Sequence, residues 1–180
     1  MGFGLRCCLP ALTALVALSG SPAVPAKPRP GYVGLKSYMT RVTPAVRSYR
    51  LLLERLDALV SQAPIGNVDP FVEALFDVRA DLGRLARRWS GLPAPRKLRA
   101  RHTDMRTAIA LESHGFALWA NALSTRDPEV IDAETEHLHG FLRSAAYLQK
   151  RWAAALRGAL RRANLTVPRW LQGMATVRVR

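Results

Sequence analysis

The segment Glu134–Gly140, ETEHLHG, holds two acids and two histidines within seven residues, the one place in the chain where such groups crowd together. Glutamate and histidine at this density could bind a divalent metal or exchange protons. Helical geometry argues against convergence, because with Leu138 facing the core His137 and His139 point about 100° to either side. Only Glu134 then lies on the inward face, so these side chains cannot meet at one metal ion.

The same segment contains a Glu-x-x-His pair, Glu134 and His137, which is the spacing found in di-iron helical bundles. Such a site needs a second pair on another helix and two further inward glutamates. Glu112 has no histidine three residues later, and Glu54 and Glu73 face outward by the same angular count. We therefore predict no metal and no cofactor.

Glu112 raises a different question, because it lies in the middle of an apolar stripe between Ile109 and Phe116. An unpaired buried carboxylate costs several kcal/mol, so this group must be paired, protonated or hydrated. Counting residues outward from the loops brings candidate partners to its level. The expected members of this buried polar cluster are Glu112, Arg79, Tyr49 and His137.

Two interpretations of the cluster stay open: an ion pair that fixes the register of the helices, or the polar site of an enzyme or of a protein that binds a metal or small ligand. The chain lacks a Ser-His-Asp grouping, a glycine-rich phosphate loop and a His-Glu-x-x-His run. His102 and His114 fall on flanking or outer faces, where histidines are usually solvated. No catalytic residue is therefore predicted, and enzymatic activity stays an open, less favoured alternative.

Residues 1–26 have one basic residue, then an apolar stretch of about a dozen residues, and then the small residues Ala23 and Ala26. This pattern is typical of a secretory signal. The elements that must position the polar groups begin after this segment. Both cysteines, Cys7 and Cys8, lie inside it, so the mature chain would have no disulfide, cysteine nucleophile or cysteine zinc site. We expect a secreted, periplasmic or cell-envelope protein that is not an integral membrane protein.

The chain has the length and composition of one domain, with 49% hydrophobic and 22% charged residues over its 180 residues. Apolar residues recur at helical spacing, and Thr43-Pro44, Asp69-Pro70 and Asp127-Pro128 are typical of helix starts. The sequence predicts an all-α, up-down-up-down four-helix bundle over 35–166, after an extended arm at 27–34 and before a C-terminal tail at 167–180. The expected helices run from Leu35 or Pro44 to Gln62, from Pro70 to Ser90, from Arg96 to Ser124 and from Pro128 to Ala163.

Asn164 is expected to end the last helix, although Asn164-Leu165-Thr166 also matches a glycosylation acceptor. The tail departs from the helical pattern after Pro168. We expect its Trp170 and Leu171 to pack against the end of the bundle.

Charge is the strongest functional signal, because the formal net charge is +14 and the charges are segregated. Acids gather in the first turns of the second and fourth helices: Asp69, Glu73, Asp77, Asp127, Glu129, Asp132, Glu134 and Glu136. Basic residues gather around the loop between the second and third helices and at the end of the fourth: Arg84, Arg87, Arg88, Arg96, Lys97, Arg99, Arg101, Arg157, Arg161 and Arg162. Helix dipoles explain part of this pattern but not its excess.

An arginine-rich end attracts polyanions. We expect the protein to act by binding an anionic polymer, an anionic membrane surface or an acidic protein. Trp89, Trp152 and Trp170 lie near this end and could stack on a ligand, although the first two occupy stripe positions typical of a core. A purely structural or helix-pairing role is a further alternative.

Overall fold

The structure is a computed structural model that describes residues 33–61 and 68–174, and all regular structure within these ranges is helical. In chain order the elements are α1 (Val33–Ser61), α2 (Asp69–Ser90), a 3₁₀ turn η1 (Arg96–Leu98), α3 (Arg99–Thr125), α4 (Pro128–Arg162) and α5 (Arg169–Met174). The prediction of an all-α fold with four long packed helices is confirmed. The expected signal at 1–26 lies outside the described residues, as does the arm at 27–34 except for its last two residues, which belong to α1.

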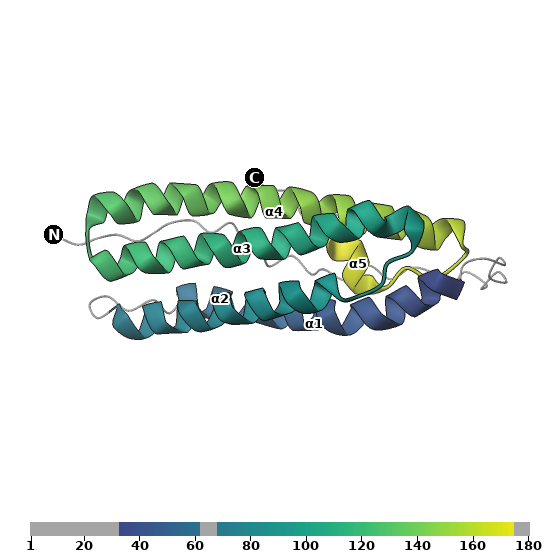
Figure 1. The fold of residues 1–180 in the computed structure, drawn as a ribbon, viewed down its shortest axis with the longest axis horizontal. Helices are drawn as coiled ribbons and strands as arrows, with labels where there is room; N and C mark the ends of the chain where they lie inside the picture. The colour runs from purple at the N-terminus through teal and green to yellow at the C-terminus, as the bar shows by residue number, and fades with distance from the viewer. Residues whose placement is uncertain (1–32, 62–67, 175–180) are drawn as a thin grey trace.

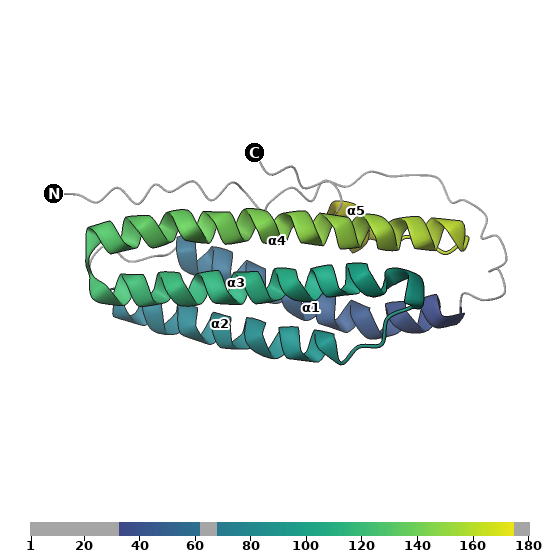
Figure 2. The same ribbon diagram turned by 45° about the horizontal axis from the view of Figure 1, so that its top comes forward.

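Successive long helices run in opposite directions, as Figures 1 and 2 show. α1 and α3 start at the end of the molecule where α2 and α4 finish. The short loops explain this arrangement, because a connection of a few residues can only return the chain alongside the helix it has left. Segments distant in sequence therefore meet at each end of the molecule.

The core is built from the apolar stripes expected from the sequence. Leu75 and Leu82 of α2, Ile109 of α3 and Leu156 of α4 are fully buried. Each such side chain contributes about 1.5–3 kcal/mol when removed from water. Other stripe positions at the margins, such as Leu59, are only partly buried and pack against this core.

The first helix begins earlier than Thr43-Pro44 suggests, since α1 starts at Val33 and contains Pro44. Thr43 does not cap a helix: its hydroxyl donates to the carbonyl of Met39 at 2.7 Å. By contrast, Asp127 caps α4 as expected, with Oδ1 accepting a hydrogen bond from the Glu129 N–H at 2.9 Å.

Asn164 closes the C-terminal end of α4, as predicted, two residues after the last helical residue, Arg162. Asn164 has a left-handed φ of 55°, its N–H donates to the Arg161 carbonyl at 3.0 Å, and the Leu165 N–H donates to the Leu160 carbonyl at 2.9 Å. These two bonds form a Schellman motif, which satisfies carbonyls that the last helical turn leaves open.

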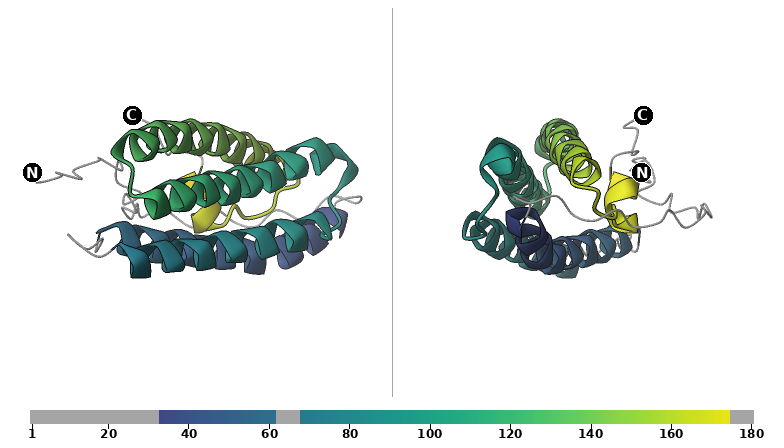
Figure 3. Two further views of the ribbon diagram at one scale, coloured as in Figure 1. Left: turned by 60° about the vertical axis from the view of Figure 1, so that its left-hand side comes forward. Right: turned by 90° about the vertical axis from the view of Figure 1, so that its right-hand side faces the viewer.

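The tail after this turn differs in part from the prediction, because Arg169–Met174 form the short helix α5. Its packing is as expected: Leu171 is fully buried and the Trp170 ring stacks on Trp152 with centroids 6.2 Å apart. Seen end-on in Figure 3, α5 lies between α4 and α1, on the side where these two long helices stand apart. The ATVRVR stretch at 175–180 lies outside the described residues.

Candidate functional site

The buried carboxyl group of Glu112 on α3 is the centre of a polar cluster that joins three helices. Tyr49 of α1 donates its hydroxyl to the carboxyl group, with Oη 2.6 Å from both Oε1 and Oε2. Gln149 of α4 donates Nε2 to Oε1 at 2.8 Å and to Tyr49 Oη at 2.5 Å. These bonds link α1 to α4 through side chains.

The cluster contains no cation, and this sets its electrostatics. Glu112 exposes only 5% of its surface and Tyr49 1%. Burial raises the pKa of Glu112 from 4.5 to about 7, although the hydrogen bonds from Tyr49 and Gln149 lower it in part. Burial also raises the pKa of the Tyr49 hydroxyl, and the neighbouring Glu112 carboxylate raises it further. Glu112 therefore holds its proton up to near-neutral pH.

Of the expected partners of Glu112, the structure brings in Tyr49 and leaves out Arg79 and His137. Arg79 is exposed, because it points about 80° away from the buried stripe of α2. His137 is exposed beside Glu134, with Nδ1 3.4 Å from Oε2. The sequence reasoning missed Gln149, although it lies four residues after Ala145 and three before Trp152, both buried.

This cluster suits a structural role better than a catalytic one. Every buried side-chain nitrogen and oxygen among the described residues has a hydrogen-bond partner. Glu112 lines neither of the two pockets described below. A general acid or base must come within hydrogen-bond distance of a substrate proton. The carboxyl group of Glu112 is enclosed by Tyr49 and Gln149, and its oxygens already accept their hydrogen bonds.

A second polar network, which the sequence reasoning missed, ties the helices together nearer the end where α2 finishes. His102 of α3 is only 7% exposed, so its expected place on a solvated face was wrong. Its Nδ1 lies 3.0 Å from Tyr38 Oη of α1, and its Nε2 lies 3.0 Å from the Trp89 carbonyl of α2. Trp152 of α4 donates Nε1 to Tyr38 Oη at 3.0 Å.

The donors and acceptors of this network favour one protonation state of His102. A carbonyl only accepts, so Nε2 must carry a hydrogen toward Trp89. Tyr38 Oη accepts from Trp152 and can donate its own hydrogen to Nδ1 of the imidazole. This arrangement suits a neutral His102, whose pKa burial lowers below 6.5 and the nearby positive charge of Arg106 lowers further.

The indoles of Trp89 and Trp152 are part of this core and are fully buried, with ring centroids 5.5 Å apart. The Trp89 indole also stacks on the His102 ring and donates Nε1 to the His102 carbonyl at 3.2 Å. Neither indole is available to stack on a ligand. Trp170 is partly buried on Trp152.

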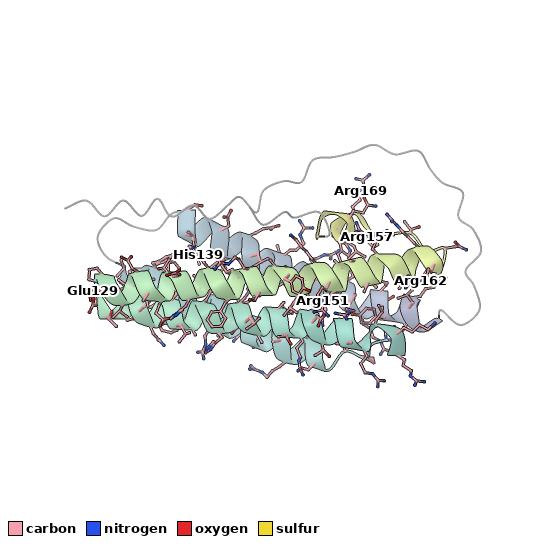
Figure 4. All side chains as sticks on the ribbon, turned by 90° about the horizontal axis from the view of Figure 1, so that it is seen from above. Glu129, His139, Arg151, Arg157, Arg162 and Arg169 are labelled. Carbon is pink, nitrogen blue, oxygen red and sulfur yellow. The ribbon has the colours of Figure 1, made fainter. Side chains whose placement is uncertain are left out.

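We call the ten predicted basic residues the basic end: Arg84, Arg87, Arg88, Arg96, Lys97, Arg99, Arg101, Arg157, Arg161 and Arg162. They come from the last turns of α2, the start of α3 with η1, and the last turns of α4, which lie at the same end of the molecule. In Figure 4, Arg157 and Arg162 lie toward this end and Glu129 marks the other. Arg169 of α5, also labelled there, adds to the basic side chains.

Ion pairing differs sharply within the basic end. Arg84 pairs with Asp81, and Arg101 pairs with Asp104 at 2.6 Å. Asp104 also forms an ion pair with Arg151, at 3.5 Å. The remaining members of the basic end form no ion pair with a carboxylate among residues 33–61 and 68–174, and most of them are exposed.

Two pockets flank the basic end. One, of about 320 Å³, lies at the corner between α2 and α3. The other, of about 410 Å³, lies between α1 and α2 and includes Arg55, Asp81 and Arg84. Asp81 pairs with both arginines, so this second pocket carries its own counter-charge.

In the described part of the chain, no group of three or more histidine, cysteine or acidic side chains is arranged to hold a metal ion. Nor is any helix in this part long and apolar enough to cross a membrane. No protein-family model, curated protein or solved structure matches this chain.

Proposed function

We propose that this protein acts by binding, and that its basic end docks an anionic partner outside the cytoplasm. The observation that carries the proposal is the convergence of cationic side chains from three helices on one end, where only Arg84 and Arg101 of the ten pair with a described carboxylate. Export rests on residues 1–26, which have the pattern of a secretory signal.

Electrostatics supports binding rather than a purely structural role. Basic residues in the last turn of a helix complement its dipole, and Arg87 and Arg88 of α2 or Arg161 and Arg162 of α4 could serve that purpose alone. Arg96, Lys97 and Arg99 stand at the start of a helix, where the same dipole repels cations. Their presence there costs stability, so we infer that a partner outside the chain compensates for it.

Rigidity supports the same proposal. The helices that carry the basic end are joined by the Tyr38–His102–Trp89–Trp152 network, which is buried and fully hydrogen-bonded. A fixed platform loses little conformational entropy on binding. Successive long helices run in opposite directions, which brings the three basic segments to one end.

The test is binding of fluorescent polyphosphate, measured by anisotropy at 50 and 200 mM NaCl. One variant removes three cations from the basic end by replacing Arg96, Arg161 and Arg162 with alanine. The control removes the same charge from the middle of the helices by replacing Arg47, Arg79 and Arg143 with alanine. None of these six residues pairs with a described carboxylate.

We expect affinity to fall steeply with salt because binding releases counterions. The first variant should flatten the dependence of log affinity on log salt by up to about three, and the second should leave it nearly unchanged. Equal effects of the two variants would mean that only net charge matters. Binding that is indifferent to salt would remove the proposal altogether.

A further inference from the structure

The pocket at the corner between α2 and α3 is a second feature of the basic end, distinct from its overall charge. Its lining consists of Ser90, Leu92, Pro93, Ala94, Arg99, His102, Thr103 and Arg106. This lining contains two guanidinium groups and no carboxylate. Its volume, about 320 Å³, is at the lower limit of small-molecule sites.

One wall of the pocket is a single face of α3. Arg99 and Arg106 are seven residues apart, which places them on the same side of the helix about 10 Å apart along its axis. The buried His102 lies between them in sequence and lines the same pocket. Neither Arg99 nor Arg106 forms an ion pair with a carboxylate in the described residues, whereas the neighbouring Arg101 is held by Asp104 at 2.6 Å.

The opposite wall is the loop that follows α2, and it is mostly apolar. Leu92, Pro93 and Ala94 line it, and two prolines in this loop restrict its backbone. The floor is fixed by the paired bonds between His102 and Trp89, at 3.0 and 3.2 Å. A ligand would therefore meet cations on one side and apolar surface on the other.

We propose that this pocket binds a phosphate group together with the small organic moiety that carries it. This inference rests on the proposed function, because it names the group of the anionic partner that the basic end would recognise. Phosphate fits better than a single carboxylate, since it presents several oxygens to two arginine forks. The apolar wall then contacts the adjoining carbons.

The α1–α2 pocket gives an internal comparison. It is larger, but Asp81 lies in it and pairs with Arg55 at 3.6 Å and with Arg84. An anion entering there would meet Arg88, which pairs with no described carboxylate, but the other two arginines of the pocket are already held by a carboxylate. The α2–α3 pocket has no such competitor among its lining residues.

The experiment measures binding of glycerol 3-phosphate to the full chain by calorimetry at constant ionic strength. Three variants distinguish binding in the pocket from attraction to the overall positive charge of the basic end. Arg99→Ala with Arg106→Ala removes the cations, Ala94→Phe fills the pocket without changing charge, and Arg47→Ala with Arg143→Ala is the charge-matched control. Circular dichroism of each variant establishes that it is folded before titration.

We expect saturable one-to-one binding that weakens about tenfold or more in the first two variants and less than about twofold in the control. Non-saturable binding, equal weakening in the control, or undiminished binding by Ala94→Phe would each overturn the inference. Polyphosphate binding in the same preparation separates the two proposals. If polyphosphate still binds at the basic end while glycerol 3-phosphate does not, the pocket inference fails and the proposed function stands; if neither binds, both fail.

A second arm identifies where the phosphate comes from. Sedimentation with vesicles of phosphatidic acid in phosphatidylcholine is compared for the Arg99/Arg106 variant and the Arg47/Arg143 control. Vesicle binding lost only in the former supports a pocket for a lipid headgroup. Binding of soluble glycerol 3-phosphate without selective vesicle loss supports a pocket for soluble phosphate esters.

Discussion

Replacing Glu112 with glutamine tests the electrostatics of the buried cluster directly. Glutamine keeps the size of the side chain but cannot ionise. In the wild-type protein the carboxyl group is held by Tyr49 and Gln149 without a cation, and burial raises its pKa from 4.5 to about 7. The variant therefore removes one proton-linked contribution to stability and leaves the packing nearly intact.

The sign of the effect follows from linkage. Between pH 4.5 and 7 the folded protein keeps a proton on Glu112 that the unfolded chain releases. The free energy of unfolding contributed by Glu112 is thus fully present below pH 4.5 and falls as the pH rises to about 7. The total loss is about 3 kcal/mol, at up to about 1.4 kcal/mol per pH unit.

The assay is urea unfolding of wild-type and Glu112→Gln protein between pH 4 and 8. From pH 4 to pH 8, the free energy of unfolding of the variant should rise by about 3 kcal/mol relative to that of the wild type. This corresponds to roughly 6–12 °C in Tm for a chain of this size. Glu136→Gln removes an exposed carboxylate and should change the free energy of unfolding by less than about 0.5 kcal/mol. A difference between wild type and Glu112→Gln that stays constant with pH, or that changes in the opposite direction, would refute the uncompensated burial of Glu112.

Three further predictions concern stability. Tyr49→Phe removes the hydroxyl that donates to Glu112, so it should lower the free energy of unfolding by about 1–3 kcal/mol in urea titrations, most strongly above pH 7, where the carboxylate is charged. His102→Gln should abolish a pH dependence of the free energy of unfolding that has the opposite sign to that of Glu112. His102 is neutral in the folded protein, so the stability that it contributes is present above pH 6.5 and falls as the pH drops below this value. A stability advantage of the wild type over this variant that does not shrink on acidification would contradict the assigned tautomer. Gly115→Ala should destabilise by about 1–3 kcal/mol because the new Cβ would lie 3.0 Å from Leu138 Cδ1 and 3.2 Å from Phe141 Cβ, whereas Gly140→Ala, with nothing within 4 Å, should stabilise α4 by about 0.5–1 kcal/mol in thermal melts.

The helices could be predicted because the burial pattern repeats along the chain. The stripe through Met105, Ile109, Phe116 and Trp119 is fixed by 3.6-residue periodicity, and all four are buried. Pro44 left the start of the first helix open between Leu35 and Pro44, because a proline inside a helix loses one hydrogen bond but can be retained when the flanking residues are buried. Val42 and Ala45 are fully buried on either side of it.

The polar networks were predicted less well, for a different physical reason. Periodicity places a side chain on a face but does not select its partner across the core. Glu112 and Tyr49 were both placed inward, yet of the three options for Glu112 (paired, protonated or hydrated) the choice of Arg79 favoured the first. A protonated acid needs only hydrogen bonds, which Gln149 supplies.

His102 carried a signal that was available in the sequence. It lies four residues after Leu98 and three before Met105, both buried, so the helical stripe passes through it. Its partner Tyr38 lies in the turns of α1 before Pro44, where a helix starting at proline would have placed no core. Of the two predicted starts, only the one at Leu35 places Tyr38 in the helix and makes it a possible partner of His102.

The most direct measurement of the central claim maps which arginines a bound polyanion covers. Exposed arginines are modified with phenylglyoxal with and without polyphosphate, and each peptide is quantified by mass spectrometry. Binding at the basic end predicts protection of Arg87, Arg96 and Arg161, with Arg47, Arg79 and Arg143 modified to the same extent in both samples. Protection spread evenly over all six, or confined to the middle of the helices, would contradict the account.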